Sequence, residues 1–399
     1  MENIQFAERM GSIRTSVVRE LAKYLSDPEV ISFSGGNPAN SSFPVEQVDE
    51  ITHDLLMTKG RQLLQYGTTS GYKPLIEAYI EHIAAPKGLA VSEDHVITLT
   101  GSMQGLDLLC KVLLNPGDTV LVEAPTFAGA LNVFRIYQAN IVSVDMDDEG
   151  IMVDQLEEIF KTQSPKLFYC IPTFQNPTGK TLGLERRKSI AELAYKYNVI
   201  VIEDDPYGDL RFSGEAVPPI KIFDPDDRII YLNSFSKILS PGLRVATMLG
   251  NPEILKKACV AKQSCDTHTA NLNQAIAAEF LNRGLLPGHL AKILPPYKVQ
   301  LDTMLKAMDD HFPSCCSYTR PEGGLFIWGE FQKDINMTDM MYKAIQEEKV
   351  AFVPGQTYFV GDTQKRAGTF RLNFSNATVD QINDGIRRLG RLFREVIAE

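Results

Sequence analysis

The feature that most constrains the fold is a regular alternation of short apolar runs with helix-like segments through the middle of the chain. Helix-like stretches such as Ser102–Leu114, Val153–Phe160 and Leu184–Tyr197 lie between runs that are apolar and mostly β-branched. Continuous apolar strands separated by helices are typical of a largely parallel sheet that is covered on both faces. The pattern therefore predicts an α/β fold, a three-layer α/β/α sandwich. The predicted strands are His95–Thr100, Thr119–Glu123, Ile141–Val144, Leu167–Ile171, Val199–Glu203, Ile229–Leu232 and Val245–Leu249.

The order of elements changes near residue 290. A long predicted helix is followed by strands at Gly324–Trp328, Ala351–Val353 and Thr369–Phe374 and by a closing helix. We therefore expect a large domain at residues 46–290 and a smaller α+β domain at residues 291–399, which the N-terminal arm at residues 1–45 joins. A chain of 399 residues with 44% hydrophobic content is long enough for such a division.

Charge and cysteine usage limit the partners and the compartment. The 50 acidic residues outnumber the 40 basic ones and give a net charge of -10, which disfavours nucleic acid and anionic membranes as partners. The six cysteines show neither a C-x-x-C pair nor metal-ligand spacing, and they are interpreted as reduced thiols. The first twenty residues lack the apolar core of a signal peptide, and no stretch approaches membrane-spanning length. We expect a cytoplasmic protein without a metal site.

Polar motifs follow several predicted strands, at the edge of the sheet where α/β proteins bind ligands. The Gly-Ser-Met-Gln-Gly segment at residues 101–105 opens a helix, whose free N–H groups can hold a phosphate, although an ordinary serine cap also explains it. The Asn-Pro-Thr-Gly segment at residues 176–179 is a turn former whatever the function.

Two further motifs carry charge. Asp204 and Asp205 follow a buried strand, where carboxylates are costly unless a cation meets them, and a magnesium ion is one alternative. Lys237, in the Ser-Phe-Ser-Lys segment at residues 234–237, lies close to Arg244 in the sequence, which suggests a covalent site beside a phosphate. A solvated surface lysine is far commoner in general, and the joint occurrence of all four motifs in this order favours the covalent site.

The ordered set of motifs resembles the fold-type I pyridoxal-phosphate-dependent aminotransferases of the aspartate aminotransferase superfamily (class I/II), over nearly the whole chain. The segments Glu-Asp-Asp-Pro-Tyr (203–207), Ser-Phe-Ser-Lys-Ile (234–238) and Phe-Arg-Leu-Asn-Phe-Ser (370–375) are most similar to the branch of 2-aminoadipate aminotransferases and kynurenine aminotransferase II. The resemblance implies pyridoxal 5′-phosphate as the cofactor. It also implies transfer of an amino group from an L-amino acid of 2-aminoadipate, aromatic or branched-chain type to a 2-oxo acid such as 2-oxoglutarate.

The resemblance assigns a task to each residue around the cofactor ring. Lys237 forms the Schiff base and then moves the proton between the substrate Cα and the cofactor. Asp204 keeps the pyridine nitrogen protonated, so that the ring accepts electrons. Tyr207 and Asn176 hydrogen-bond the 3′ oxygen, and Phe127 stacks on the ring face.

The resemblance also assigns phosphate and substrate contacts. It implies that the phosphate is bound by the helix end at Ser102 and Met103, by Ser234 and Ser236, and by Arg244, whose planar fork suits a phosphate. It also implies a homodimer, in which Tyr66 of the neighbouring subunit reaches the phosphate.

Arg371 binds the substrate α-carboxylate, with a small-domain salt bridge as the alternative, and Asn176 is a further substrate-binding residue. Gly36 lets the backbone approach the substrate, although a turn alone explains it. Arg14 meets the substrate side chain, and the N-terminal arm is a candidate lid.

Other functions remain as alternatives. A β-lyase or racemase can be built on the same fold, because fold does not fix the outcome of carbanion chemistry. A transcription regulator with an aminotransferase-like domain carries a basic helix-turn-helix segment in front, whereas only a few dozen residues of mixed charge precede Gly35 and Gly36. A magnesium-dependent phosphotransferase based on Asp204 and Asp205 lacks a P-loop lysine.

Overall fold

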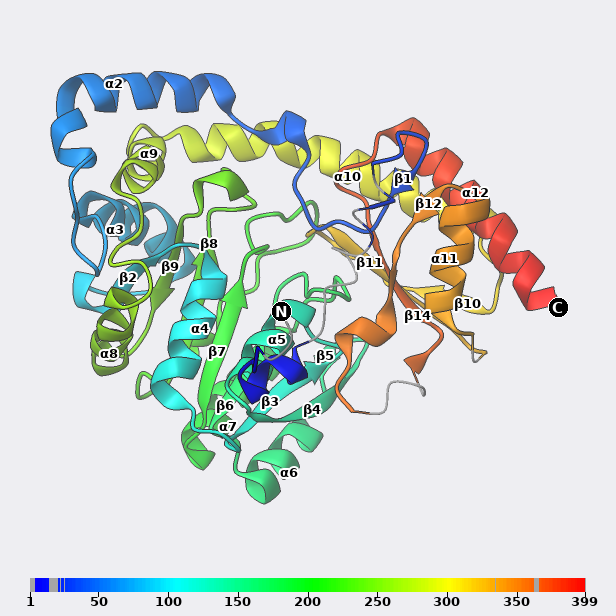
Figure 1. Ribbon diagram of the computed structural model, residues 1–399, viewed down its shortest axis with the longest axis horizontal. Coiled ribbons are helices and arrows are strands. Elements are labelled where there is room, and N and C mark those ends of the chain that lie inside the picture. Colours follow the sequence, from blue (N-terminus) through cyan, green and yellow to red (C-terminus); the bar gives the residue numbers. More distant parts are fainter. Residues whose placement is uncertain are drawn as a thin grey trace.

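The centre of the protein is a mixed eight-stranded sheet (Figure 1). The computed structural model describes residues 4–13, 21, 23–24, 26–333, 335–361 and 366–398. Strands β8, β7, β6, β3 and β4 are neighbours in this order and are parallel to one another. Strand β9 is antiparallel to both of its neighbours, and β5 is antiparallel to β4. The predicted mostly parallel sheet is confirmed, and the direction of β9 is an addition to it. The spatial order is β2 (Val96–Leu99), β9 (Ala246–Leu249), β8 (Ile229–Ser234), β7 (Ile200–Asp205), β6 (Leu167–Cys170), β3 (Thr119–Ala124), β4 (Asn140–Asp147) and β5 (Gly150–Ile151).

Helices cover both faces of this sheet, as the apolar strands predict. Successive residues of a strand point to opposite faces, so Val120 and Val122 of β3 belong to one hydrophobic cluster and Leu121 to another. The helices that pack on the first face include α4 and α5, and those on the second are α6 and α7. The helices of this part are α2 (Val45–Leu63), α3 (Lys73–Tyr79), α4 (Ser102–Leu113), α5 (Ala128–Ile136), α6 (Val153–Gln163), α7 (Leu184–Tyr197), α8 (Pro252–Gln263) and α9 (Asn271–Asn282).

The C-terminal part contains a four-stranded antiparallel sheet in the order β10 (Cys316–Tyr318), β11 (Phe326–Phe331), β14 (Thr369–Asn373) and β13 (Val353–Pro354). The predicted strand at residues 351–353 is divided, because β12 (Val350–Ala351) pairs with β1 (Ile31–Ser32) while β13 pairs with β14. Helices α11 (Met337–Glu347) and α12 (Val379–Ala398) lie beside this sheet (Figure 1). An early segment of the chain thus packs with a late one.

Helix α10 (Leu285–His311) connects the two cores. Its residues Ile293 and Tyr297 pack in the core of the large sheet, whereas Leu301 and Met304 pack with the C-terminal elements. Pro295 and Pro296 lie inside the helix between Ile293 and Tyr297, and thus within its contacts with the large core. None of the described helices is long and apolar enough to cross a membrane.

Helix α4 lies unusually close to the sheet at Gly105. A Cβ atom there would lie 2.7 Å from Leu99 Cδ1 of β2 and 2.9 Å from Leu232 Cδ2 of β8. Glycine therefore sets the distance between the sheet and the helix that begins at Ser102.

We expect Gly105→Ala to lower the free energy of unfolding by about 1–3 kcal/mol, because the added methyl overpacks a buried contact. Gly60→Ala in α2 is the matched control, since its Cβ would meet only Leu56 of the same helix, at 3.9 Å. This variant should gain about 0.5–1 kcal/mol from helix propensity. Urea denaturation of the two variants and the parent measures both changes, and equal stabilities would contradict the close packing of α4.

Candidate functional site

Lys237 lies in the turn that follows β8, and its amine points toward a segment far away in sequence. Its Nζ donates a hydrogen bond to the carbonyl oxygen of Gly36 at 2.9 Å, and it forms no ion pair with any described carboxylate. Burial, together with the positive charges of Arg244 and Arg371, lowers the pKa of Lys237 to about 8. A sizeable fraction of the amine is therefore neutral, and so nucleophilic, near neutral pH.

Asp204, at the end of β7, keeps one carboxylate oxygen without a partner. Tyr169 donates its hydroxyl to Oδ2 at 2.8 Å, whereas Oδ1 has no hydrogen-bond partner among the described residues. Burial raises the pKa of Asp204 to about 7, and Asp205 adds to the shift. A buried carboxylate oxygen is stabilised by a cationic or donor group, and for Oδ1 the described residues supply none.

Asp205 has a different set of partners. Its carboxylate accepts hydrogen bonds from the hydroxyl of Tyr231, from Lys87 Nζ at 3.3 Å and from the Gly208 N–H at 2.8 Å. Adjacent residues of a strand face opposite sides, so Asp204 and Asp205 do not converge on one ion. Within the described part of the chain, no group of three or more His, Cys, Asp or Glu side chains is placed to hold a metal.

Arg371, on β14, is buried and binds neutral groups. Its Nη1 donates to Asn176 Oδ1 at 3.0 Å and its Nη2 to the Ser34 carbonyl at 2.6 Å, while Nε has no partner among the described residues. The guanidinium also lies over the rings of Phe326 and Tyr358, 4.3 and 5.3 Å from their centroids. The salt bridge considered as an alternative is absent with respect to the described carboxylates. A buried cation with a free donor suits an anionic ligand.

Asn176 connects this arginine to Tyr207. The Asn176 amide donates to the Tyr207 hydroxyl at 3.5 Å, and both side chains are buried. Gly36 completes the group: it offers its carbonyl to Lys237, and a Cβ on it would lie 3.2 Å from Phe326 Cζ. The predicted residues of the sheet edge and of the C-terminal part are thus brought together.

Arg244 faces the beginning of α4. A Cβ on Gly101, which has φ +87°, would lie 2.1 Å from Arg244 Nη2, so only glycine fits beside the guanidinium. The acceptors of Arg244 are backbone carbonyls at 3.4 and 3.5 Å. Ser102 and Met103 form the first turn of α4, and no side chain caps it. Uncapped N–H groups and a guanidinium favour an anion such as phosphate.

Five other predicted residues remain, and the structure describes four of them. Ser234 is buried at the end of β8 and accepts a hydrogen bond from the N–H of half-buried Ser236 at 3.2 Å. Phe127 is the N-cap residue of α5 and is half-buried. The Tyr66 side chain is 82% exposed, with its ring edge-on to that of His268. Arg14 lies outside the described residues.

Sequence reasoning missed Tyr169, the partner of Asp204. Tyr169 pairs with Ile202 across β6 and β7, two residues before Asp204, so it lies on the same face of the sheet. A tyrosine in an otherwise apolar strand was the signal, because a buried hydroxyl needs a partner.

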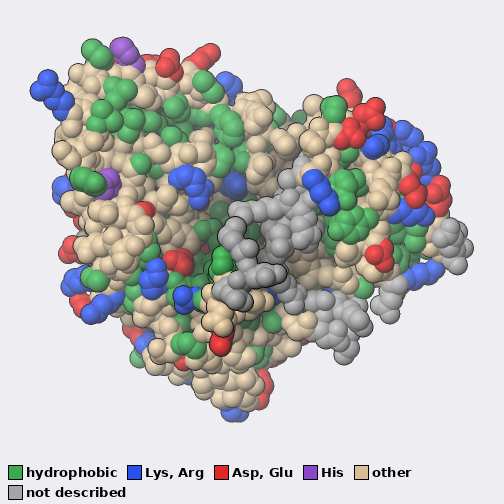
Figure 2. Space-filling model, viewed as in Figure 1, with side chains coloured by type: hydrophobic (Ala, Val, Ile, Leu, Met, Phe, Trp, Pro, Cys, Tyr) green, Lys and Arg blue, Asp and Glu red, His purple; other side chains and the backbone are tan. Residues whose placement is uncertain are grey.

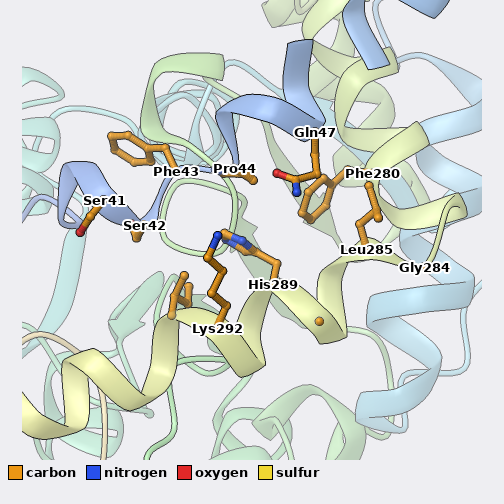
Figure 3. A pocket seen from close by; sticks show the side chains of 12 residues that line it. Ser41, Ser42, Phe43, Pro44, Gln47, Phe280, Gly284, Leu285, His289 and Lys292 are labelled. Carbon is orange, nitrogen blue, oxygen red and sulfur yellow. The ribbon is translucent and has the colours of Figure 1, made fainter. Parts of the chain in front are cut away.

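The cavity in Figure 3 is separate from these residues. It has a volume of about 270 Å³ and lies between the beginnings of α2 and α10, where Gln47, His289 and Lys292 line it with Phe43 and Phe280. None of the predicted site residues that the structure describes lines it.

The family of the chain follows from comparison with known proteins. The sequence profile described as aminotransferase class I and II matches residues 28–389, and the chain belongs to this family.

Individual relatives agree with this assignment. The aromatic-amino-acid aminotransferase 1 of Thermococcus litoralis is 42% identical over 395 residues, which are 98% of this chain and 94% of the relative. The structure of a Pyrococcus horikoshii kynurenine aminotransferase in complex with PMP is 40% identical, with a TM-score of 0.93, and the match covers 98% of this chain and 97% of that one. An alpha-aminoadipate aminotransferase from Thermus thermophilus, complexed with N-(5'-phosphopyridoxyl)-L-leucine, is 38% identical, with a TM-score of 0.90 and 98% of each chain covered. The protein is a pyridoxal-phosphate-dependent aminotransferase.

The environment of Asp204 predicts a pH-dependent stability of the cofactor-free protein. The carboxyl titrates near pH 4 in the unfolded chain and near pH 7 in the folded one, so the folded protein binds more protons between these values. The free energy of unfolding should therefore fall as the pH rises through this window, by about 3 kcal/mol at most between pH 5 and pH 8.

Asp204→Asn should remove this part of the pH dependence, as urea denaturation of the two proteins at several pH values measures. Buried Glu203, whose pKa is raised to about 7, contributes to both proteins, whereas the raised pKa of Glu123, to which the Asp204 charge adds, should fall slightly in the variant. An identical slope in the variant would contradict the burial of an isolated Asp204 carboxylate.

Proposed function

We propose that this enzyme moves an amino group from an L-amino acid of 2-aminoadipate, aromatic or branched-chain type to a 2-oxo acid such as 2-oxoglutarate, with Lys237 as its catalytic amine. The observation that carries the proposal is the Lys237 amine, which has a lowered pKa and no described carboxylate partner. The donor classes are supported by the relatives, whose names specify aromatic amino acids, kynurenine and alpha-aminoadipate.

The residues fit pyridoxal 5′-phosphate. The free Oδ1 of Asp204 suits a protonated ring nitrogen, and Asn176 and Tyr207 suit the 3′ oxygen. Phe127 would pack against the ring. The phosphate would be bound by the first turn of α4 at Ser102 and Met103, together with Ser234, Ser236 and Arg244. When bound, the cofactor supplies an electron sink for the negative charge that develops on the substrate Cα.

Lys237 and Arg371 then have complementary tasks in the reaction. Lys237 is the residue that would hold the cofactor through its aldehyde, and its neutral amine would take and return a proton at the substrate Cα. Arg371 binds the substrate α-carboxylate and so fixes the direction of the Cα–H bond. Gly36 leaves the substrate room beside Phe326, because any side chain there would contact that ring.

We also propose that the active unit is a homodimer in which Tyr66 reaches the phosphate of the neighbouring subunit. Large apolar side chains are exposed on and just after α2, namely Leu56, Met57 and Leu64, beside Tyr66. Figure 2 shows hydrophobic side chains gathered over the region where α2 and α9 lie. Such a gathering of exposed apolar groups is typical of a protein interface.

The compartment and the domain limits complete the proposal. We place the enzyme in the cytoplasm, in keeping with six free cysteines. The large domain spans residues 46–290, and the small domain spans residues 291–399 with the arm at residues 1–45; the pairing of β1 with β12 supports this grouping.

A panel of amino donors with 2-oxoglutarate tests the proposed reaction. The parent enzyme should turn over 2-aminoadipate and aromatic or branched-chain donors faster than aspartate and form glutamate, as coupled detection of glutamate measures.

Lys237→Ala should lower kcat by at least about 10⁴-fold, because the amine that transfers the proton is gone. Release of ammonia and pyruvate from suitable donors would instead indicate a β-lyase, and a Lys237→Ala enzyme with substantial turnover would exclude this lysine as the catalytic amine.

Arg371→Lys tests the carboxylate site separately. Lysine keeps the charge and loses the planar fork, so KM for the amino donor should rise about 10- to 100-fold. The dissociation constant of pyridoxal phosphate, measured by absorbance titration, should stay within about twofold. Loss of cofactor affinity with an unchanged KM would contradict the assigned role.

A further inference from the structure

A buried lysine outside the residues discussed so far has no role in the reaction described above. Lys262, near the end of α8, has a side chain with 0% exposure. Its Nζ donates to both carboxylate oxygens of Asp266 at 2.8 Å, to Gln104 Oε1 at 3.1 Å and to Thr269 Oγ1 at 3.2 Å. The side chain is thus buried and its ammonium group is fully hydrogen-bonded. Burying a charge costs free energy, which suggests that this lysine serves to hold its neighbours in place.

The acceptors of this lysine hold the segment that leads from β2 into α4, here called the α4 turn (Thr100–Gln104). Asp266 Oδ2 accepts from Thr100 Oγ1 and from Gln104 Nε2, both at 2.7 Å. Gln104 Oε1 in turn accepts from the backbone N–H of Thr100 at 2.8 Å. The Lys262–Asp266 ion pair therefore holds both ends of the turn, Thr100 at one end and Gln104 at the other.

The free side of the α4 turn faces Arg244. The Thr100 carbonyl accepts from Arg244 Nη2 at 3.5 Å, and Gly101 leaves no space between the turn and the guanidinium. The Lys262–Asp266 pair and Arg244 thus both hold Thr100, one through its side chain and the other through its carbonyl. A shift of the α4 turn would move the first N–H groups of α4 away from Arg244.

We infer that Lys262, Asp266 and Gln104 are positioning residues that preorganise the α4 turn for the cofactor phosphate, and thereby set how tightly the phosphate, rather than the ring, is bound. The inference rests on the proposed phosphate site at Ser102, Met103 and Arg244. None of the three positioning residues is required to touch the cofactor. Preorganised donors bind an anion more tightly because no ordering is required at the moment of binding.

The test compares two cofactors that differ only in the phosphate. The full-length protein, depleted of cofactor, is titrated with pyridoxal 5′-phosphate and with pyridoxal, and binding is followed by absorbance. Lys262→Met should raise the dissociation constant of pyridoxal phosphate about tenfold, which corresponds to one charge-assisted hydrogen bond, and leave that of pyridoxal within about twofold.

Two further variants keep the result interpretable. Lys256→Met removes an exposed lysine from the same helix, where it pairs only with Glu253, and should change neither constant. Thr100→Val deletes only the hydroxyl that binds Asp266 and Thr269, and it should weaken phosphate-dependent binding even if Lys262→Met does not fold.

The outcomes separate this inference from the proposed phosphate site itself. If Lys262→Met and Thr100→Val weaken both cofactors equally, or neither of them, the cluster has no phosphate-specific role and the inference is wrong. If the parent enzyme itself binds pyridoxal as tightly as pyridoxal phosphate, the proposed phosphate site fails, and the inference fails with it.

Discussion

Charge that is buried without a full set of partners is the constraint on which the site depends. Asp204 keeps a free carboxylate oxygen, Arg371 keeps a free Nε, and Lys237 is bound only to a carbonyl among the described residues. Each of these groups costs stability in the folded chain, and each is stabilised by a ligand of opposite or complementary character. Together they favour a ligand that offers a donor to Asp204, an anionic group to Arg371 and an electrophile to Lys237, as the proposed cofactor and substrate would.

The alternation of side chains along the strands of the sheet keeps these charges apart. Because side chains alternate along β7, Asp204 reaches the site while Asp205 joins Lys87 and Tyr231 on the other face. The C-terminal sheet adds Arg371 from β14, and the segment at residues 34–36 contributes the carbonyls that meet Arg371 and Lys237. Distant parts of the chain thus meet at one edge of the sheet.

Much of this could be predicted from the sequence, because local patterns carry the necessary information. Apolar runs located the strands of the large sheet, and motifs just after strands located Asn176, Asp204, Lys237 and Arg244. The reversed direction of β9 and the division of residues 350–354 into two strands depend on which strand lies alongside, which no local pattern records. The roles of Tyr169 and Lys262 could not be predicted for the same reason, since they depend on partners 35 and 158 residues away in the sequence.

The continuous course of α10 limits how the two cores can move against each other. Pro295 and Pro296 lack the N–H groups that would bond to the carbonyls of Ala291 and Lys292, so the helix is weakest between Ile293 and Tyr297, where it packs in the large core. A bend at the proline pair would move Tyr297 relative to Ile293, although both residues pack in the same core. Packing in the large core therefore braces the weakest part of α10, and it resists a movement of the part of the chain that carries Arg371 relative to the part that carries Lys237.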